Sequence, residues 1–108
     1  MGREKPEVVP IVKEFRRKVA KKCGIERMIL FGSRASGKGR KDSDVDLLVV
    51  SRRKSKLKLL SQLYHEWHVV QQIDYPVDFV CYTPKEFEDL EKRITIVREA
   101  VKEGVEVT

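Results

Sequence analysis

The sequence predicts an α/β (α+β) domain in which a small mixed β-sheet is flanked by helices. Helix and strand signals alternate along the chain, without repeats or low-complexity linkers, and this alternation is typical of helices packed on a sheet. Short apolar runs that indicate strands are 28–31, 45–50 and 77–82. Longer stretches with apolar residues at helical spacing are 8–24, 57–70 and 83–104.

The first helix is expected from apolar residues that recur with the period of a helix. They are Val8, Ile11, Val12, Phe15 and Val19. Pro6 and Pro10 leave its first residue open, because proline fits the first position of a helix. Gly24 marks its expected end.

Three strands are expected from apolar runs bounded by turn residues. Met28–Phe31 is closed by Gly32, Val45–Val50 is closed by Ser51, and Val77–Tyr82 is a third run. Each run has the length of a strand rather than of a helix.

The second and third helices have different signals. A stripe of apolar residues predicts the second helix: Leu57, Leu60, Leu63, Tyr64, Trp67 and Val70. For the third, Thr83 to Glu86 supply an N-cap, a proline at the first helical position and a reciprocal glutamate. Its β-branched segment 94–97 is a candidate break into two helices. Beyond Gly104, the alternating 105–107 is expected to add an edge strand.

Composition limits the class of protein. The 108 residues carry a net charge of +6 and are 41% hydrophobic, which suits one domain spanning 1–108. No apolar run has the length of a membrane span and no apolar signal core follows Met1, so a cytoplasmic protein without membrane contact is expected. Cys23 and Cys81 lack the spacing of a zinc site and are expected to be buried thiols.

Chemistry concentrates in the segment Gly32–Val50. Gly32, Gly37 and Gly39 permit backbone conformations that bring N–H groups close to an anion, and Ser33 adds a hydroxyl donor. The segment therefore predicts a turn that can hold phosphates.

Paired acids follow this turn. Asp44 and Asp46 are two residues apart at the start of a strand, so their carboxylates share one face and invite a cation such as Mg²⁺. Asp78 interrupts the next strand and would complete a three-carboxylate site for two metal ions if the strands are neighbours. The alternative is an ordinary polar turn including Asp42, with Asp78 as a solvated strand-end acid.

These motifs together resemble the minimal nucleotidyltransferases of the DNA polymerase beta superfamily. The pattern G-S-x-A-x-G appears at Gly32–Gly37, S-D-x-D-L at Ser43–Leu47, and the later strand acid at Asp78. The tail Ala100–Val105 is also of the family type. The resemblance covers nearly the whole chain and implies a polymerase beta-like nucleotidyltransferase fold over the single domain 1–108.

The resemblance also implies roles for individual residues. Asp44 and Asp46 would ligate two Mg²⁺ ions, and Asp78 would ligate the ion that activates the attacking hydroxyl. The residues expected to contact the nucleotide are Gly32, Ser33, Arg34 and Ser43.

The expected function is a metal-dependent transfer of a nucleoside monophosphate, AMP from ATP, to a hydroxyl acceptor. The resemblance suggests a tyrosine of a helical HEPN-type toxin as the acceptor, with this chain as the antitoxin in a homo- or hetero-oligomer. The shortness of the chain also favours an acceptor recognised in another molecule. Two alternatives are a catalytically silent antitoxin and a small basic nucleic-acid-binding module, which is not favoured.

Other signals are weaker. Gly32–Lys38 nearly matches a P-loop, but Gly39 replaces the required hydroxyl residue. His65 and His68 lack the spacing of a helical zinc site and are expected to be solvated. The basic run 52–58 is expected to be a solvated charge run rather than a binding patch.

Three aromatic residues on the apolar stripes are expected in the core or at a partner interface rather than as base-stacking platforms. They are Tyr64, Trp67 and Phe87.

Overall fold

The computed structural model describes residues 8–36, 44–93 and 95–108. The strands are β1 (Ile25–Phe31), β2 (Val45–Ser51), β3 (Val77–Tyr82) and β4 (Val105–Glu106). The helices are α1 (Val8–Val19), α2 (Ser33–Ser36), α3 (Lys56–His65), the π-helical turn η1 (Glu66–Val70), α4 (Pro84–Glu91) and α5 (Ile96–Glu103).

The sheet is mixed, as the sequence predicts. Its order in the described part of the chain is β3-β2-β1-β4. β1 is antiparallel to both β2 and β4, whereas β2 and β3 are parallel. A parallel pair needs a crossover connection, which α3 and η1 supply. This arrangement brings the beginnings of β2 and β3 to the same end of the sheet as the end of β1.

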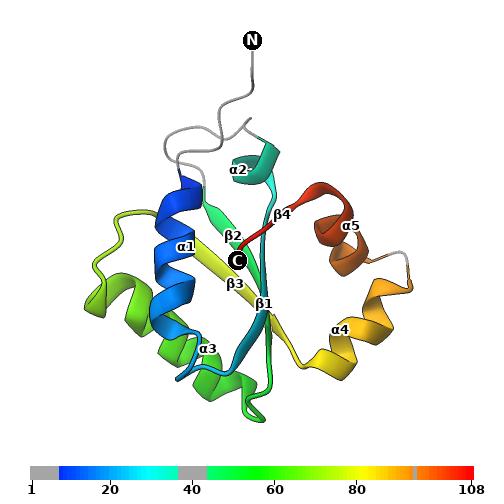
Figure 1. The fold of residues 1–108 in the computed structure, drawn as a ribbon, viewed down its shortest axis with the longest axis horizontal. Coiled ribbons are helices and arrows are strands. Elements are labelled where there is room, and N and C mark those ends of the chain that lie inside the picture. Colours follow the sequence, from blue (N-terminus) through cyan, green and yellow to red (C-terminus); the bar gives the residue numbers. More distant parts are fainter. Residues whose placement is uncertain (1–7, 37–43, 94) are drawn as a thin grey trace.

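Helices cover both faces of the sheet, with α1, α3 and η1 on one face and α4 and α5 on the other (Figure 1). The central strand β2 is apolar on both faces. Val45, Leu47 and Val49 pack with α1 and α3, whereas Leu48 and Val50 pack with α4 and α5. This two-sided burial explains why β2 is an unbroken apolar run after Asp46.

Aromatic side chains form the centre of the larger core. Trp67 and Phe15 are fully buried and meet edge to face, with ring centroids 4.9 Å apart. Phe79 of β3 lies 5.8 Å from Phe15 and 6.0 Å from Trp67. These contacts join α1, η1 and β3. Trp67 and also Phe87 are therefore core residues, as expected.

The boundaries of the first two elements differ from the prediction. α1 ends at Val19, and a turn that contains Gly24 at φ 59° leads into β1. β1 starts at Ile25 rather than Met28. The added residues include Glu26, which is exposed, so an apolar run alone could not reveal them.

The second helix is not regular throughout. α3 ends at His65, and η1 continues it as a π-helical turn in which the Gln71 N–H donates to the carbonyl of Glu66 at 2.8 Å. The indole N–H of Trp67 donates to the carbonyl of Tyr75 at 2.8 Å. The π-helical turn was not predicted, because apolar spacing over 57–70 fits one continuous helix.

The predicted break in the third helix is confirmed. α4 begins with the expected capping box of Thr83 and Glu86 and ends at Glu91. α5 begins at Ile96, with Thr95 as its N-cap, and the Thr95 hydroxyl also donates to the carbonyl of Leu90 at 2.8 Å. The expected edge strand is β4, which pairs with β1.

Both cysteines are buried free thiols, as expected. Burial raises the pKa of Cys81 to about 12, so this thiol is unreactive at neutral pH. Within the described ranges, no helix has both the length and the apolar character to cross a membrane.

Candidate functional site

Two carboxylates stand side by side at the end of the sheet near α2. The parallel register pairs Asp46 of β2 with Asp78 of β3. Side chains of register partners leave the sheet on the same face, and neighbouring strands are about 4.8 Å apart. Asp44 lies two residues before Asp46 and is exposed. The expected neighbourhood of β2 and β3 is therefore present.

The pKa of Asp46 is raised in this environment. Partial burial raises the pKa of Asp46 above its ordinary value of 3.8, and the negative charges of Asp78 and Asp44 raise it further. Over the described ranges, no ion pair neutralises any of the three carboxylates. The described residues therefore leave these three carboxylates without an ion-pair partner.

Gly32 makes room for the Asp46 carboxylate. Antiparallel pairing places Phe31, the last residue of β1, opposite Asp46, and Gly32 follows with φ 75°. A Cβ atom at position 32 would collide with Oδ2 of Asp46. Both the backbone angle and the missing side chain therefore require glycine here.

The predicted nucleotide-binding residues fall in different environments. Gly32 and Ser33 are exposed at the turn beside Asp46. Arg34 is only 9% exposed, and its guanidinium lies 5.1 Å from the ring centroid of Tyr75. Ser43 lies outside the described residues, as do Gly37, Gly39 and Asp42. The structure thus places Gly32 and Ser33 near the acids, and the nucleotide contacts stay predictions.

Tyr64 contacts one of these acids, although the sequence predicted it only as a core or partner-interface residue. Its ring is half-buried, and its hydroxyl donates to Oδ1 of Asp78 at 3.2 Å. The same hydroxyl accepts a hydrogen bond from the Phe79 N–H at 3.1 Å. Burial of the ring raises the pKa of Tyr64, so the hydroxyl keeps its proton at neutral pH. Its position on an apolar stripe did not reveal this contact.

The donors suit a hard cation in number and type. Mg²⁺ takes one or two carboxylates from a protein and completes its shell with water and substrate phosphates. The adjacent Asp46 and Asp78 offer such a pair, and Gly32 leaves space at Oδ2 of Asp46. Among the described residues no cluster of three or more His, Cys, Asp or Glu could hold a metal ion, so the expected three-carboxylate metal site stays a prediction.

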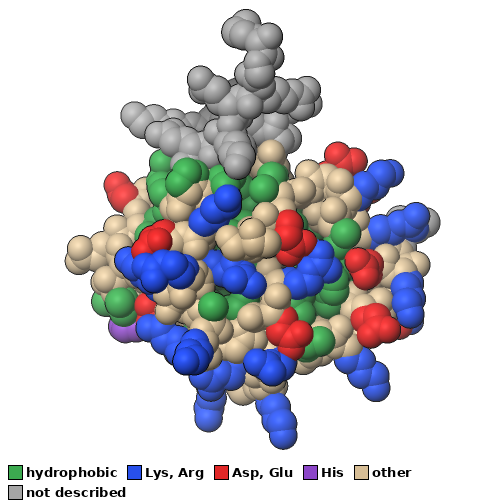
Figure 2. Space-filling view, in the orientation of Figure 1, with side chains coloured by type: hydrophobic (Ala, Val, Ile, Leu, Met, Phe, Trp, Pro, Cys, Tyr) green, Lys and Arg blue, Asp and Glu red, His purple; other side chains and the backbone are tan. Residues whose placement is uncertain are grey.

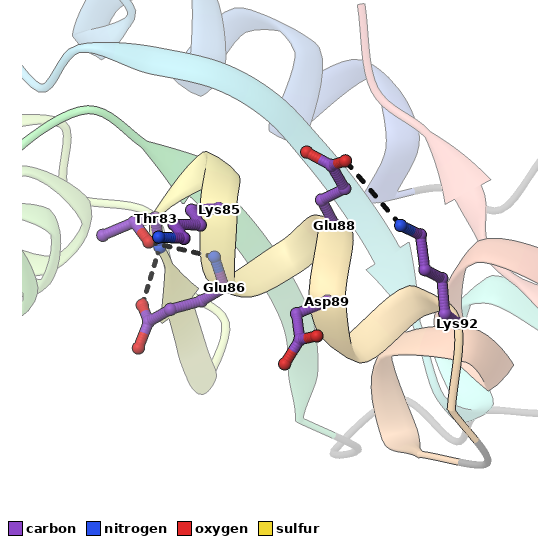
Figure 3. A pocket seen from close by; sticks show the side chains of 6 residues that line it. All are labelled: Thr83, Lys85, Glu86, Glu88, Asp89 and Lys92. Atoms are coloured by element: carbon purple, nitrogen blue, oxygen red, sulfur yellow. Dashed lines mark hydrogen bonds and ion pairs between the residues drawn. The ribbon is translucent and has the colours of Figure 1, made fainter.

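One pocket lies elsewhere, on α4 (Figure 3). Several of its lining side chains have structural partners: the Thr83 hydroxyl accepts from the Glu86 N–H at 3.2 Å, and Lys92 lies 3.8 Å from Glu88. Thr83 comes directly after the last residue of β3, whereas Asp78 lies near the beginning of that strand. This pocket is therefore separate from the acidic end of the sheet.

The basic run 52–58 is exposed and partly neutralised, in agreement with a solvated charge run. Arg52 lies 3.3 Å from Glu26, and Lys56 lies 2.9 Å from Glu86. On the face seen in Figure 2, acidic side chains lie among the Lys and Arg side chains. His65 and His68 are exposed, as expected.

Most of the chain matches one known protein family. Residues 12–103 match the family described as "Nucleotidyltransferase domain". A stretch of 54 residues is 39% identical to a protein of Methanocaldococcus jannaschii named as a candidate protein adenylyltransferase. The match includes 48% of this chain and 54% of that protein, so the chain spans about half the length of this curated relative.

Solved structures share the fold. A candidate minimal nucleotidyltransferase superposes with a TM-score of 0.67 at 23% identity over 97% of this chain and 98% of the other. A toxin–antitoxin structure with AMP-PNP gives 0.61 at 19% identity over 89% and 72%. A candidate nucleotidyltransferase from Sulfolobus solfataricus gives 0.55 at 24% identity over 98% and 89%. These matches confirm the predicted fold.

Replacing Gly32 by alanine should destabilise the protein more than the same change at Gly24. Both glycines have positive φ, so both variants pay the backbone strain of about 1–2 kcal/mol. Only at position 32 does the new Cβ meet the Asp46 carboxylate; at Gly24 the nearest atom, Oγ of Ser51, is 3.6 Å away. Urea unfolding of both variants gives the difference.

A double variant isolates the collision. In Gly32→Ala/Asp46→Ala the colliding carboxylate is gone, so the excess cost of Gly32→Ala should shrink in a double-mutant cycle. Equal costs at positions 24 and 32, or no coupling in the cycle, would contradict the close approach of Gly32 and Asp46.

Without divalent metal, Asp46→Asn should stabilise the fold at pH 7 by about 1 kcal/mol or less. The pKa of Asp46 is raised on folding, so its contribution favours the native state at low pH and is lost as the pH rises through that raised value. The gain from Asn should therefore disappear below pH 3.8, where the carboxyl group is protonated in both the native and the unfolded protein. Urea unfolding across this pH range measures it.

Asp89→Asn is the matched control, because Asp89 lies 3.3 Å from Arg93 in an exposed ion pair. That change should not stabilise the protein at pH 7. A metal-free Asp46→Asn variant that is less stable than wild type at pH 7 would show that repulsion does not dominate at Asp46.

Proposed function

Because this chain belongs to the nucleotidyltransferase domain family, we propose that it transfers AMP from ATP to a hydroxyl acceptor at the acidic end of its sheet. The observation that carries the proposal is the in-register pair of Asp46 and Asp78, next to the turn at Gly32. This pair has no basic partner in the described part of the chain, which suits a site that binds a triphosphate through cations.

In the proposed site, Asp44 and Asp46 would hold Mg²⁺ together with the triphosphate, and Asp78 would hold the ion on the acceptor side. When bound, the two ions would neutralise charge on the phosphates and lower the pKa of the attacking hydroxyl. Gly32 and Ser33 would lie beside the phosphates, because they follow the strand that ends opposite Asp46. Arg34 and Ser43 are the further residues proposed to contact the nucleotide.

The reaction is an in-line displacement. The acceptor hydroxyl gives up its proton to water and its oxygen forms a bond to the α-phosphorus of ATP. The bond from that phosphorus to the bridging oxygen breaks, and pyrophosphate leaves with the electron pair. The role of the chain is to hold both reactants at the end of one rigid sheet, since precise placement lowers the entropic part of the barrier. The name of the Methanocaldococcus jannaschii relative supports AMP as the transferred group and a protein as the acceptor.

We further propose that 1–108 acts as one minimal nucleotidyltransferase domain with a separate acceptor protein. The toxin–antitoxin structure with AMP-PNP supports a nucleotide-dependent antitoxin role. The acceptor group in this proposal is a tyrosine on a helical toxin of HEPN type. The oxygen of a phenol can serve as the nucleophile once its proton is removed.

Asp78→Ala should lower the transfer of AMP to the toxin partner by about 100-fold or more, because the ion on the acceptor side would lose a ligand and with it the electrostatic stabilisation of the attacking oxygen. The affinity for Mg²⁺–ATP should change little, since Asp44 and Asp46 remain. Transfer of label from α-labelled ATP to the partner, followed by mass spectrometry, measures the first quantity. Calorimetry measures the second.

Asp89→Ala is the control for this variant, because it removes an equally exposed acid from α4. It should transfer label as wild type does. If wild type and Asp78→Ala both neutralise the toxin and neither labels it, the chain acts as a silent antitoxin by occlusion.

A further inference from the structure

We propose that Tyr64 is a positioning residue, whose hydroxyl fixes the Asp78 carboxylate in the orientation that serves the acceptor. The inference rests on the proposed function and assigns a role in it to a side chain of α3. Tyr64 itself is not expected to contact ATP, and its effect would pass through Asp78.

The hydroxyl of Tyr64 bridges a backbone group and a carboxylate. It accepts from the Phe79 N–H at 3.1 Å and donates to Oδ1 of Asp78 at 3.2 Å. β3 is the outermost strand of the sheet on this side, so alternate N–H groups point away from β2. Tyr64 accepts from one of these groups, and the bridge ties the carboxylate to the backbone of its own strand.

Packing of the Tyr64 ring holds the side chain in place independently of the hydrogen bonds of its hydroxyl. It packs edge to face on Phe79 with ring centroids 5.0 Å apart, and it lies parallel to His68 at 6.3 Å. Since α3 is fixed on the sheet by Leu59 and Leu63, the tyrosine loses little further freedom when it bonds Asp78.

Asp78 has few other restraints. Its side chain is exposed, and no Lys or Arg pairs with it in the described ranges. Without Tyr64 the carboxylate would be free to rotate in water. The bridge engages Oδ1 and leaves Oδ2 without a protein donor in the described part of the chain. Such a restraint matters in catalysis, because small misplacements of a reacting group cost rate.

Tyr64→Phe removes the hydroxyl and keeps the ring, and Tyr82→Phe is the matched control. Tyr82 is the last residue of β3, the strand that carries Asp78 near its beginning. Tyr82 is half-buried, and its hydroxyl makes no hydrogen bond in the described part of the chain. Its ring faces Nζ of Lys56 at 5.2 Å, a contact that phenylalanine retains. Both variants should fold with nearly the melting temperature of wild type.

Two readouts test the bridge. Amide hydrogen exchange by NMR should be about fivefold faster at Phe79 in Tyr64→Phe, because its N–H loses a protein acceptor. The kcat for AMP transfer to the partner should fall about fivefold or more, with the KM and Kd for ATP unchanged. Tyr82→Phe should match wild type in each measurement.

The outcomes separate this inference from the proposed function. If wild type transfers AMP and Tyr64→Phe has the same kcat, the positioning role is wrong and the proposed function stands. If kcat and KM change together with a large loss of melting temperature, Tyr64 has only a structural role and the inference fails. If wild type transfers no AMP to any tested partner, the proposed function and this inference both fall.

Discussion

The parallel pairing of β2 with β3 holds Asp46 beside Asp78 against the repulsion of two like charges. Burial raises the pKa of Asp46, and the negative charges of Asp78 and Asp44 raise it further. What keeps the strands together is the core beneath them, in which Phe79 meets the buried rings of Phe15 and Trp67. Burial of large aromatic side chains contributes about 1.5–3 kcal/mol each, more than a partly exposed repulsion costs. The acidic end of the sheet therefore depends on the core for its geometry.

The neighbours of the two acids serve the same arrangement. Gly32 has no side chain where Oδ2 of Asp46 lies, so β1 can end against a carboxylate. Tyr64 reaches from α3 to the edge strand and bonds both the Phe79 N–H and Asp78. Gly32 thus leaves space for the Asp46 carboxylate, and Tyr64 restrains the Asp78 carboxylate. Both features lie at the same end of the sheet, away from the pocket on α4, which makes this end the centre of the proposed chemistry.

Much of the fold could be predicted from the sequence, because apolar period and capping chemistry are local signals. The three central strands, the capping box at Thr83 and the break before Ile96 follow from such signals. The π-helical turn η1 could not be predicted, since the apolar spacing over 57–70 fits one continuous helix. The site was predicted in part: the spacing of Asp44 and Asp46 and the acid at Asp78 marked its carboxylates, whereas the hydroxyl contact of Tyr64 depends on tertiary packing. Ser43 lies outside the described residues, so its role stays a prediction.

Calorimetry of ATP binding with and without Mg²⁺ tests the central claim most directly, namely that the carboxylates at this end of the sheet bind a triphosphate through a cation. Wild type should bind ATP tightly only with Mg²⁺, because Asp44, Asp46 and Asp78 repel the free triphosphate. The variant Asp44→Asn/Asp46→Asn should fold normally and lose the Mg²⁺-dependent part of the affinity. An unchanged affinity for Mg²⁺–ATP in this double variant would contradict the account.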